Sequence, residues 1–217
     1  MKLLKLIPFI ILFICCSASD SSSSSTQDES IPVQEDMFFV PQTIDGVQIQ
    51  REVLLHLPEN FDSTESYPVV IAFHGNGGQN NNWFSKLSQF VDAGEFVGVY
   101  PQGYLNSWNL GSEASSADEI YFFNQIMLKL DTYSFFDASK VYGIGNSNGS
   151  ALINKLAIET SHFSAIAALA SQLIVGTTPN PSTSPVSVYQ MCGTADNIIP
   201  YNGGISFVGH NFLSASD

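Results

Sequence analysis

The chain has 217 residues, of which 44% are hydrophobic and 12% are charged. This length suits one domain better than two, and the apolar share excludes a wholly disordered protein. The formal net charge is −13 and no basic cluster occurs, so nucleic acid is excluded as an expected partner, as is direct binding to an anionic membrane.

The first 16 residues have the pattern of an export signal. Lys2 and Lys5 precede an apolar run over residues 6–16, which is too short to span a bilayer. The run ends in Cys15 and Cys16, and a serine tract follows. This order resembles a bacterial lipoprotein signal, which implies lipidation of Cys16 as a membrane anchor. Cleavage at Cys15, simple secretion without a lipid and a short buried helix are the alternatives. In either exported case we expect an extracellular or cell-surface protein.

Residues 17–36 are rich in Ser and acidic residues and predict a flexible linker. The body, residues 37–217, alternates short apolar runs with helical patterns, beginning with a hairpin around the turn Asp45–Gly46. Further strands are expected at 68–74, 96–100, 141–144, 163–170 and 186–192, and helices at about 82–92, 117–130 and 148–160. This alternation predicts an α/β fold with a mostly parallel sheet and helices on both faces. Functional residues are then expected at the carboxyl ends of the strands.

Ser147 is the candidate nucleophile. It lies in Gly145-Asn146-Ser147-Asn148-Gly149, between an apolar strand and a helical pattern, which is the setting of a nucleophile elbow. The positions two before and two after the serine must be tiny, because a Cβ atom there would strike neighbouring backbone. An ordinary glycine-rich turn with an incidental serine is the alternative.

A second glycine-rich turn, His74-Gly75-Asn76-Gly77-Gly78, follows the buried strand at 68–74. Its backbone can approach a substrate oxygen closely. The backbone N–H groups of Asn76 and Asn148 are therefore the candidate oxyanion hole, each worth roughly 3–4 kcal/mol to catalysis. We expect His74 to fix this loop by hydrogen bonds.

Asp196 is the candidate acid of a catalytic triad. It follows the strand at 186–192 in Gly193-Thr194-Ala195-Asp196, downstream of the serine, which matches the chain order Ser…Asp…His. Its role would be to orient an imidazole base. The alternative is a turn residue whose carboxylate accepts hydrogen bonds from nearby backbone.

These motifs, together with Tyr100-Pro101-Gln102-Gly103, Ser107-Trp108-Asn109 and the GTADNIIPYNGG segment, resemble the esterase family of polyhydroxybutyrate depolymerases and feruloyl or acetylxylan esterases. The resemblance runs from about Gly46 to Asp217. It implies an α/β-hydrolase fold, Ser147 as nucleophile and Asp196 as triad acid. Members commonly carry a His where Cys192 stands, which is a mild departure.

The resemblance also implies a histidine base in a late loop, after a further helix and strand. His210 is the one histidine after Asp196, and 14 residues are too few for a helix and a strand. Residues 211–217 read as the start of a helix that is cut short. We therefore expect a C-terminally incomplete domain, inactive or weakly active, with His210 as a stand-in base at best.

The preferred function is an exported serine carboxylesterase that acts on polymer-linked acyl groups, either feruloyl or acetyl polysaccharide esters or a polyhydroxyalkanoate. Trp108 and Tyr104 are candidates for stacking on substrate rings, with Trp83 and Phe84 nearby. No cluster has metal-ligand spacing, and we expect no metal or other cofactor. The alternatives are a non-catalytic surface protein that binds a polymer or glycan, and a peptidase on the same fold.

Overall fold

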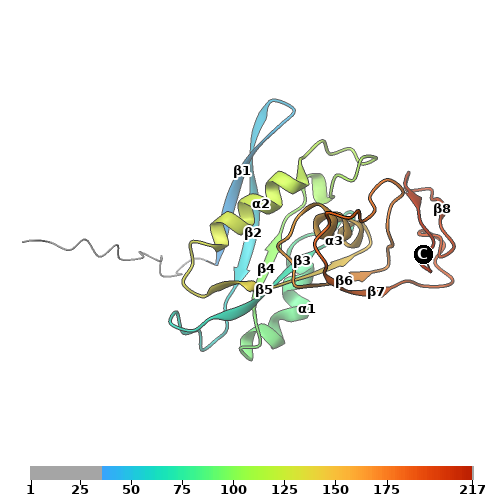
Figure 1. The fold of residues 1–217 in the computed structure, drawn as a ribbon. Helices are drawn as coiled ribbons and strands as arrows, with labels where there is room; N and C mark the ends of the chain where they lie inside the picture. The colour runs from blue at the N-terminus through green and yellow to red at the C-terminus, as the bar shows by residue number, and fades with distance from the viewer. Residues whose placement is uncertain (1–35, 217) are drawn as a thin grey trace, which may run out of the picture.

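The computed structural model describes residues 36–216, which fold around one large sheet (Figure 1). The expected signal with Cys16, and the linker apart from Asp36, lie outside the described residues. The strands of the large sheet are β1 (Met37–Ile44), β2 (Val47–His56), β3 (Tyr67–Phe73), β4 (Val97–Pro101), β5 (Phe136–Asn146), β6 (Ala165–Leu169) and β7 (Ser187–Met191). The helices are α1 (Asn81–Asp92), α2 (Glu119–Leu130) and α3 (Asn148–Glu159), with a 3-10 turn at Tyr104–Asn106. A small hairpin joins β8 (Gly204–Ile205) to β9 (Asn211–Phe212).

The strand order of the large sheet is β1-β2-β4-β3-β5-β6-β7. The β1–β2 and β2–β4 pairs are antiparallel, whereas β4, β3, β5, β6 and β7 run parallel to one another. The predicted mostly parallel sheet is therefore confirmed. Because β3, β5, β6 and β7 share one direction, the loops that follow them emerge at the same edge, where a site can form.

Helices cover both faces of the sheet, as predicted. Ile71 points into the main core, which α2 and α3 cover, whereas its neighbour Ala72 packs with Trp83 of α1 and with Tyr100. Figure 1 shows α1 on the opposite side of the strands from α2 and α3. Alternate side chains of β3 are thus buried on opposite faces, which explains the continuous apolar sequence of this strand.

The predicted hairpin turn is confirmed, with Asp45 and Gly46 both at positive φ. β5 is longer than expected because Phe136 already pairs with Tyr67, ahead of an irregularity in the register. β1 and β7 form the two edges of the sheet, and all residues of β7 are exposed.

The expectation that a helix begins at residues 211–217 is wrong, because Asn211 and Phe212 form β9 and residues 213–216 are not helical. Asn211 accepts a hydrogen bond from the N–H of Val175 at 2.8 Å, and the N–H of Leu213 donates to the carbonyl of Leu173 at 2.8 Å. Phe212 is buried at 3% exposure. These tertiary contacts override the local helical preference of the segment.

One buried ion pair joins β2 of the hairpin to the first residue of α2. Arg51 Nη1 lies 2.8 Å from Glu119 Oε2, and each side chain is 1% exposed. The guanidinium also lies 3.5 Å from the ring centre of Phe122 and donates to Gln42 at 3.0 Å. The other oxygen of Glu119 accepts the N–H of Asn109 at 3.1 Å. The pair therefore anchors the segment that leads from β4 to α2.

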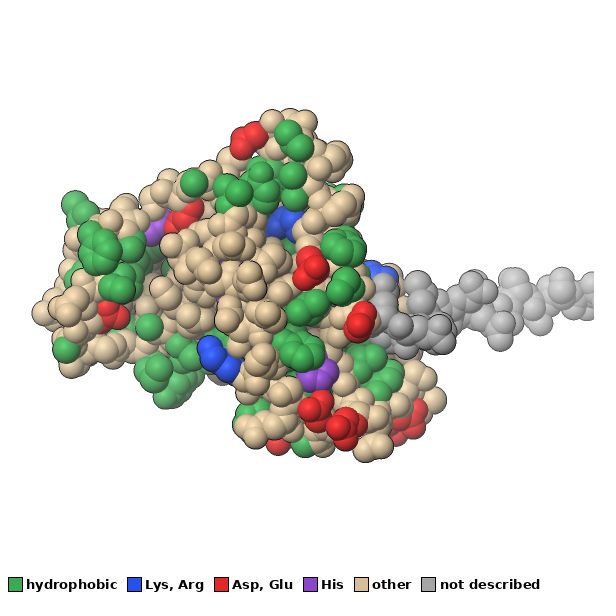
Figure 2. Space-filling view, turned by 180° about the vertical axis from the view of Figure 1, so that it is seen from behind, with side chains coloured by type: hydrophobic (Ala, Val, Ile, Leu, Met, Phe, Trp, Pro, Cys, Tyr) green, Lys and Arg blue, Asp and Glu red, His purple; other side chains and the backbone are tan. Residues whose placement is uncertain are grey.

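Basic side chains are scattered singly over the face seen in Figure 2, among acidic and neutral ones. Within residues 36–216, no helix is long and apolar enough to cross a membrane.

We predict that R51M lowers the free energy of unfolding by about 3–5 kcal/mol, because it leaves the carboxylate of Glu119 buried without its partner. The double variant R51M/E119L should regain much of this loss. Urea unfolding followed by circular dichroism measures both. As a control, K155A removes the exposed pair between Lys155 and Glu159 and should cost less than about 1 kcal/mol. Equal losses for R51M and K155A would contradict the assignment.

Candidate active site

Ser147 occupies a strained turn between β5 and α3. Its backbone has φ 52° and ψ −120°, a conformation that is costly for a residue with a side chain. The turn is held by neighbouring backbone, since the N–H of Ser147 donates to the carbonyl of Leu169 at 2.8 Å. The structure therefore has the strand–turn–helix geometry that the sequence predicted at this position.

Two glycines permit this turn. A Cβ atom at Gly149 would lie 2.4 Å from the carbonyl oxygen of Phe73 and 2.5 Å from that of His74. A Cβ atom at Gly145 would lie 2.2 Å from the carbonyl oxygen of Gly149. The glycines thus let the first turn of α3 press against the ends of β3 and β5, as expected from the sequence.

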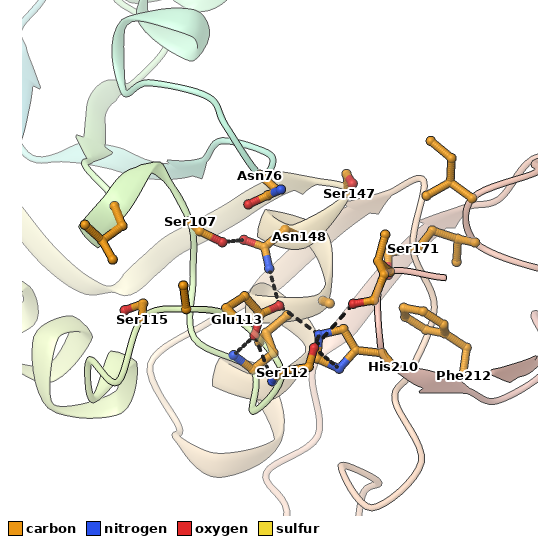
Figure 3. Close-up of a pocket in the computed structure, with 17 residues that line it drawn as sticks. Asn76, Ser107, Ser112, Glu113, Ser115, Ser147, Asn148, Ser171, His210 and Phe212 are labelled. Carbon is orange, nitrogen blue, oxygen red and sulfur yellow. Dashed lines mark hydrogen bonds and ion pairs between the residues drawn. The ribbon is translucent and has the colours of Figure 1, made fainter. Parts of the chain in front are cut away.

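Ser147 lines a cavity of about 390 Å³ at the carboxyl edge of the sheet (Figure 3). The wall combines polar and apolar side chains from the turn after β3, the loop before α2, the elbow, and the segments after β6 and β7. The lining residues used below are Asn76, Glu113, Asn148, Ile198, Ile199 and His210. The volume lies within the usual range for small-molecule sites, about 300–1,000 Å³.

The two candidate oxyanion donors both line this cavity. Neither Asn76 nor Asn148 donates its backbone N–H to an acceptor within residues 36–216. The N–H of Asn148 belongs to the first turn of α3, where the helix dipole favours negative charge. The turn that carries Asn76 is fixed by the N–H of Gly77, which donates to the carbonyl of Asn106 at 2.7 Å.

His74 fixes the same turn. Its Nδ1–H donates to the carbonyl of Gly75 at 2.8 Å, and its Nε2 accepts the N–H of Gly103 at 3.0 Å. These two contacts require the neutral ring with the proton on Nδ1. Burial lowers the pKa of His74, with a smaller opposing effect from the bond to Gly75. The expected loop-fixing role of this histidine agrees with these contacts.

The expectation that Trp108 stacks on substrate is wrong. Its side chain is fully buried, and its indole N–H donates to the carbonyl of His74 at 2.7 Å. Trp83 likewise is buried in α1 and donates to the carbonyl of Phe73 at 2.9 Å. Phe84, also in α1, stacks on His56 rather than facing the cavity. Trp108 and Trp83 thus brace the end of β3.

Tyr104 does not line the cavity, whereas its neighbour Leu105 does. Leu105 and Asn106 both have positive φ, so the backbone bends sharply here. The next residue, Ser107, lines the cavity.

Asp196 lies beside the cavity. Its Oδ1 accepts the N–H groups of Ile198 at 2.7 Å and Ile199 at 2.9 Å, and these two residues line the cavity. This is the turn contact that the sequence left open as the alternative. The second oxygen, Oδ2, has no hydrogen-bond donor within the described part of the chain.

The carboxylate and imidazole that do meet at the cavity are Glu113 and His210. Glu113 Oε1 lies 2.8 Å from His210 Nε2, although 97 residues separate them in sequence. Figure 3 shows the pair on the cavity wall below the elbow. His210 can be singled out from the sequence as the histidine after Asp196, whereas Glu113 cannot, because no local motif marks it. Within residues 36–216, no group of three or more His, Cys, Asp or Glu side chains is placed to bind a metal ion.

We predict that G149A is destabilising by about 1–3 kcal/mol, because the added methyl group meets backbone that cannot move independently. Thermal unfolding measures this loss. G193A is the matched control, since the nearest atom there would lie 3.7 Å from the new Cβ. Similar melting temperatures for the two variants would contradict the close approach at Gly149.

We also predict an acid-sensitive contribution from His74. Because burial lowers its pKa below the ordinary value of 6.5, the unfolded chain binds a proton at pH values where the folded chain does not. The stabilisation is complete above the unfolded pKa and decreases as the pH falls toward the folded one. The stability advantage of the wild type over H74Q should therefore shrink between about pH 7.5 and 5. Melting temperatures across this range test it, and a constant difference would refute it.

The chain is similar to several curated esterases, although no family model matches it. It is 28% identical to feruloyl esterase B of Piromyces equi over 73% of this chain and 31% of that protein. It is 23% identical to a probable feruloyl esterase C of Aspergillus niger over 74% of this chain and 62% of the relative. It is 27% identical to a probable feruloyl esterase C of Aspergillus terreus over 82% of this chain and 68% of the relative. The chain thus spans less than two thirds of the first two relatives.

Solved structures show the same fold at low identity. A thermostable esterase superposes with a TM-score of 0.59 and 17% identity, covering 77% of this chain and 49% of that one. Esterase 2 of Thermogutta terrifontis superposes with a TM-score of 0.56 and 13% identity, covering 77% of this chain and 74% of that one. The chain has the α/β-hydrolase fold of these esterases and is similar in sequence to proteins named feruloyl esterase.

Proposed function

We propose that this chain carries the nucleophile of an exported serine carboxylesterase. The observation that supports this most directly is the strained turn at Ser147, beside a cavity that Asn76 and Asn148 also line; the backbone N–H groups of these two residues have no acceptor within residues 36–216. A strained serine costs stability, and such strain is concentrated at functional sites. The similarity to proteins named feruloyl esterase points to the same chemistry.

In the proposed reaction, Ser147 Oγ attacks the ester carbonyl carbon while a base accepts the hydroxyl proton. The carbonyl oxygen becomes an oxyanion, which the N–H groups of Asn76 and Asn148 stabilise. The alkoxide leaves with a proton returned by the base, and an acyl-enzyme remains. Water, activated by the same base, then releases the carboxylic acid and restores Ser147.

We propose Asp196 as the residue that orients the base. Its Oδ1 is held by the backbone of Ile198 and Ile199, which leaves Oδ2 to accept an imidazole N–H. His210 does not fill this place, because its Nε2 faces Glu113. We therefore propose that the base is a histidine contributed by protein outside this chain, which covers 62% of the length of the A. niger relative.

For substrate, we propose polymer-linked acyl esters, with feruloyl or acetyl groups on polysaccharide first and a polyhydroxyalkanoate second. The relatives' names favour the first, and the mixed polar and apolar wall of the cavity suits an acyl group bearing a ring or a short chain. We further propose that the enzyme is exported and that Cys16 is lipidated. Export would place the enzyme where such polymers occur.

The proposal is tested with a fluorophosphonate probe on the protein encoded by the whole reading frame. Stoichiometric labelling is expected at Ser147, located by peptide mass spectrometry, and none in S147A. Methyl ferulate and p-nitrophenyl acetate should be hydrolysed, and D196N should lower kcat by up to about 10⁴-fold. A folded protein that is never labelled would instead be a polymer-binding relative. Cleavage of a peptide amide without ester hydrolysis would indicate a peptidase.

A further inference from the structure

Glu113 is held by donors on both of its carboxylate oxygens. Oε1 accepts from His210 Nε2 at 2.8 Å and from Asn148 Nδ2 at 3.0 Å. Oε2 accepts the backbone N–H groups of Leu110 at 2.7 Å and Ser112 at 3.3 Å. An ionised carboxylate offers about four lone-pair sites. Four donors therefore occupy this one, and none is left for a substrate hydroxyl.

The partner that matters most for chemistry is Asn148. Its side-chain Oδ1 accepts the N–H of Trp108 at 2.8 Å, and its Nδ2 donates to the carbonyl of Trp108 at 3.1 Å as well as to Glu113. The side chain is thus clamped between Trp108 and Glu113. The backbone N–H of this same residue is one of the two proposed oxyanion donors.

The segment that clamps Asn148 also contacts the other oxyanion turn. The indole of Trp108 donates to the carbonyl of His74, two residues before Asn76. The two proposed donors come from different strand ends, and the segment before α2 contacts the turn that carries each of them. Within this loop Glu113 supplies the charged contact, and charge-assisted hydrogen bonds are about twice as strong as neutral ones.

We propose that Glu113 is a positioning residue of the oxyanion hole, acting through the side chain of Asn148. This inference rests on the proposed function. The same carboxylate holds His210 of the β8–β9 hairpin, whose Val208, His210 and Phe212 form one wall of the cavity (Figure 3). Glu113 thereby holds both the side chain of Asn148 and one residue of this wall.

The geometry separates this role from general-base catalysis by His210. Ser112 Oγ lies 2.7 Å from His210 Nε2 and 3.4 Å from Nδ1, so both ring nitrogens have neighbours on the loop before α2. No hydrogen bond joins His210 to Ser147 within residues 36–216. The imidazole therefore fixes the hairpin to Glu113.

The test is a double-mutant cycle on the inactivation of Ser147 by a fluorophosphonate, whose phosphoryl oxygen enters the oxyanion hole. E113A should lower kinact about 10- to 100-fold, somewhat less than outright loss of a donor. N148A keeps the backbone N–H but removes the clamp, and should lower kinact similarly. The double variant E113A/N148A should be no slower than the slower single variant, and E113Q should recover part of the rate. Effects that multiply in the double variant, or an unchanged kinact in E113A, would overturn the proposal.

H210Q separates the two contacts of Glu113. This variant removes the imidazole and leaves the carboxylate of Glu113 bound to Asn148. The main change should therefore be in KI, because the variant alters the cavity wall that contacts the probe. A loss of kinact as large as that of E113A would assign the effect to His210 and refute the proposal.

A readout independent of chemistry is the backbone amide resonance of Asn148 in a ¹H–¹⁵N spectrum. E113A should shift this resonance while the melting temperature shows that the variant is folded, and an unshifted resonance would count against the proposal. A wild type that is not labelled at Ser147 would refute the proposed function itself. Labelled wild type with unaffected variants would refute only the role of Glu113.

Discussion

The close approach of α3 to the end of β3 is the constraint on which the site depends. The backbone of Gly149 lies against the carbonyl oxygens of Phe73 and His74, at separations that no larger residue permits. This contact brings the first turn of α3 beside the glycine-rich turn after β3. As a result, Asn76 and Asn148, which come from segments about 70 residues apart, line one cavity together with the strained serine. Since the proposed oxyanion donors are backbone groups, their placement is decided by packing of the main chain.

A second layer of contacts holds this arrangement in place. Trp108 connects the two turns, because its main chain binds the side chain of Asn148 and its indole binds the carbonyl of His74. The loop that carries it is anchored in turn by the buried pair of Arg51 and Glu119, through the N–H of Asn109. The antiparallel hairpin at one edge of the sheet therefore supports the site by a chain of direct contacts. Trp108, which lies near the candidate catalytic motif, therefore has a structural role here.

Much of this fold could be predicted from the sequence, because its main elements are marked by local patterns. The apolar strand before His74, the Asp45–Gly46 turn and the strand–serine–helix order at Ser147 each depend on nearby residues. The pairing of Glu113 with His210 could not be predicted, since it joins two loops across 97 positions and neither loop has a periodic pattern. The same limit explains the error at Trp108. Its sequence context places it near the site, but only the packing of the core shows which way its ring points. The strand at residues 211–212 could not be predicted from a local pattern, because the hydrogen bonds that hold this segment, from Val175 to Asn211 and from Leu213 to Leu173, involve another loop.

The open edge at β7 has a consequence for the behaviour of residues 36–216 in solution. Val188, Tyr189 and Met191 are 54%, 64% and 50% exposed on a strand that, in the described range, has a neighbour on one side only. Unpaired backbone groups beside apolar side chains form a template for edge-to-edge association. The acidic surface opposes this through long-range repulsion, which salt screens within about 10 Å at 0.1 M. The protein described by residues 36–216 should therefore associate more readily as ionic strength increases.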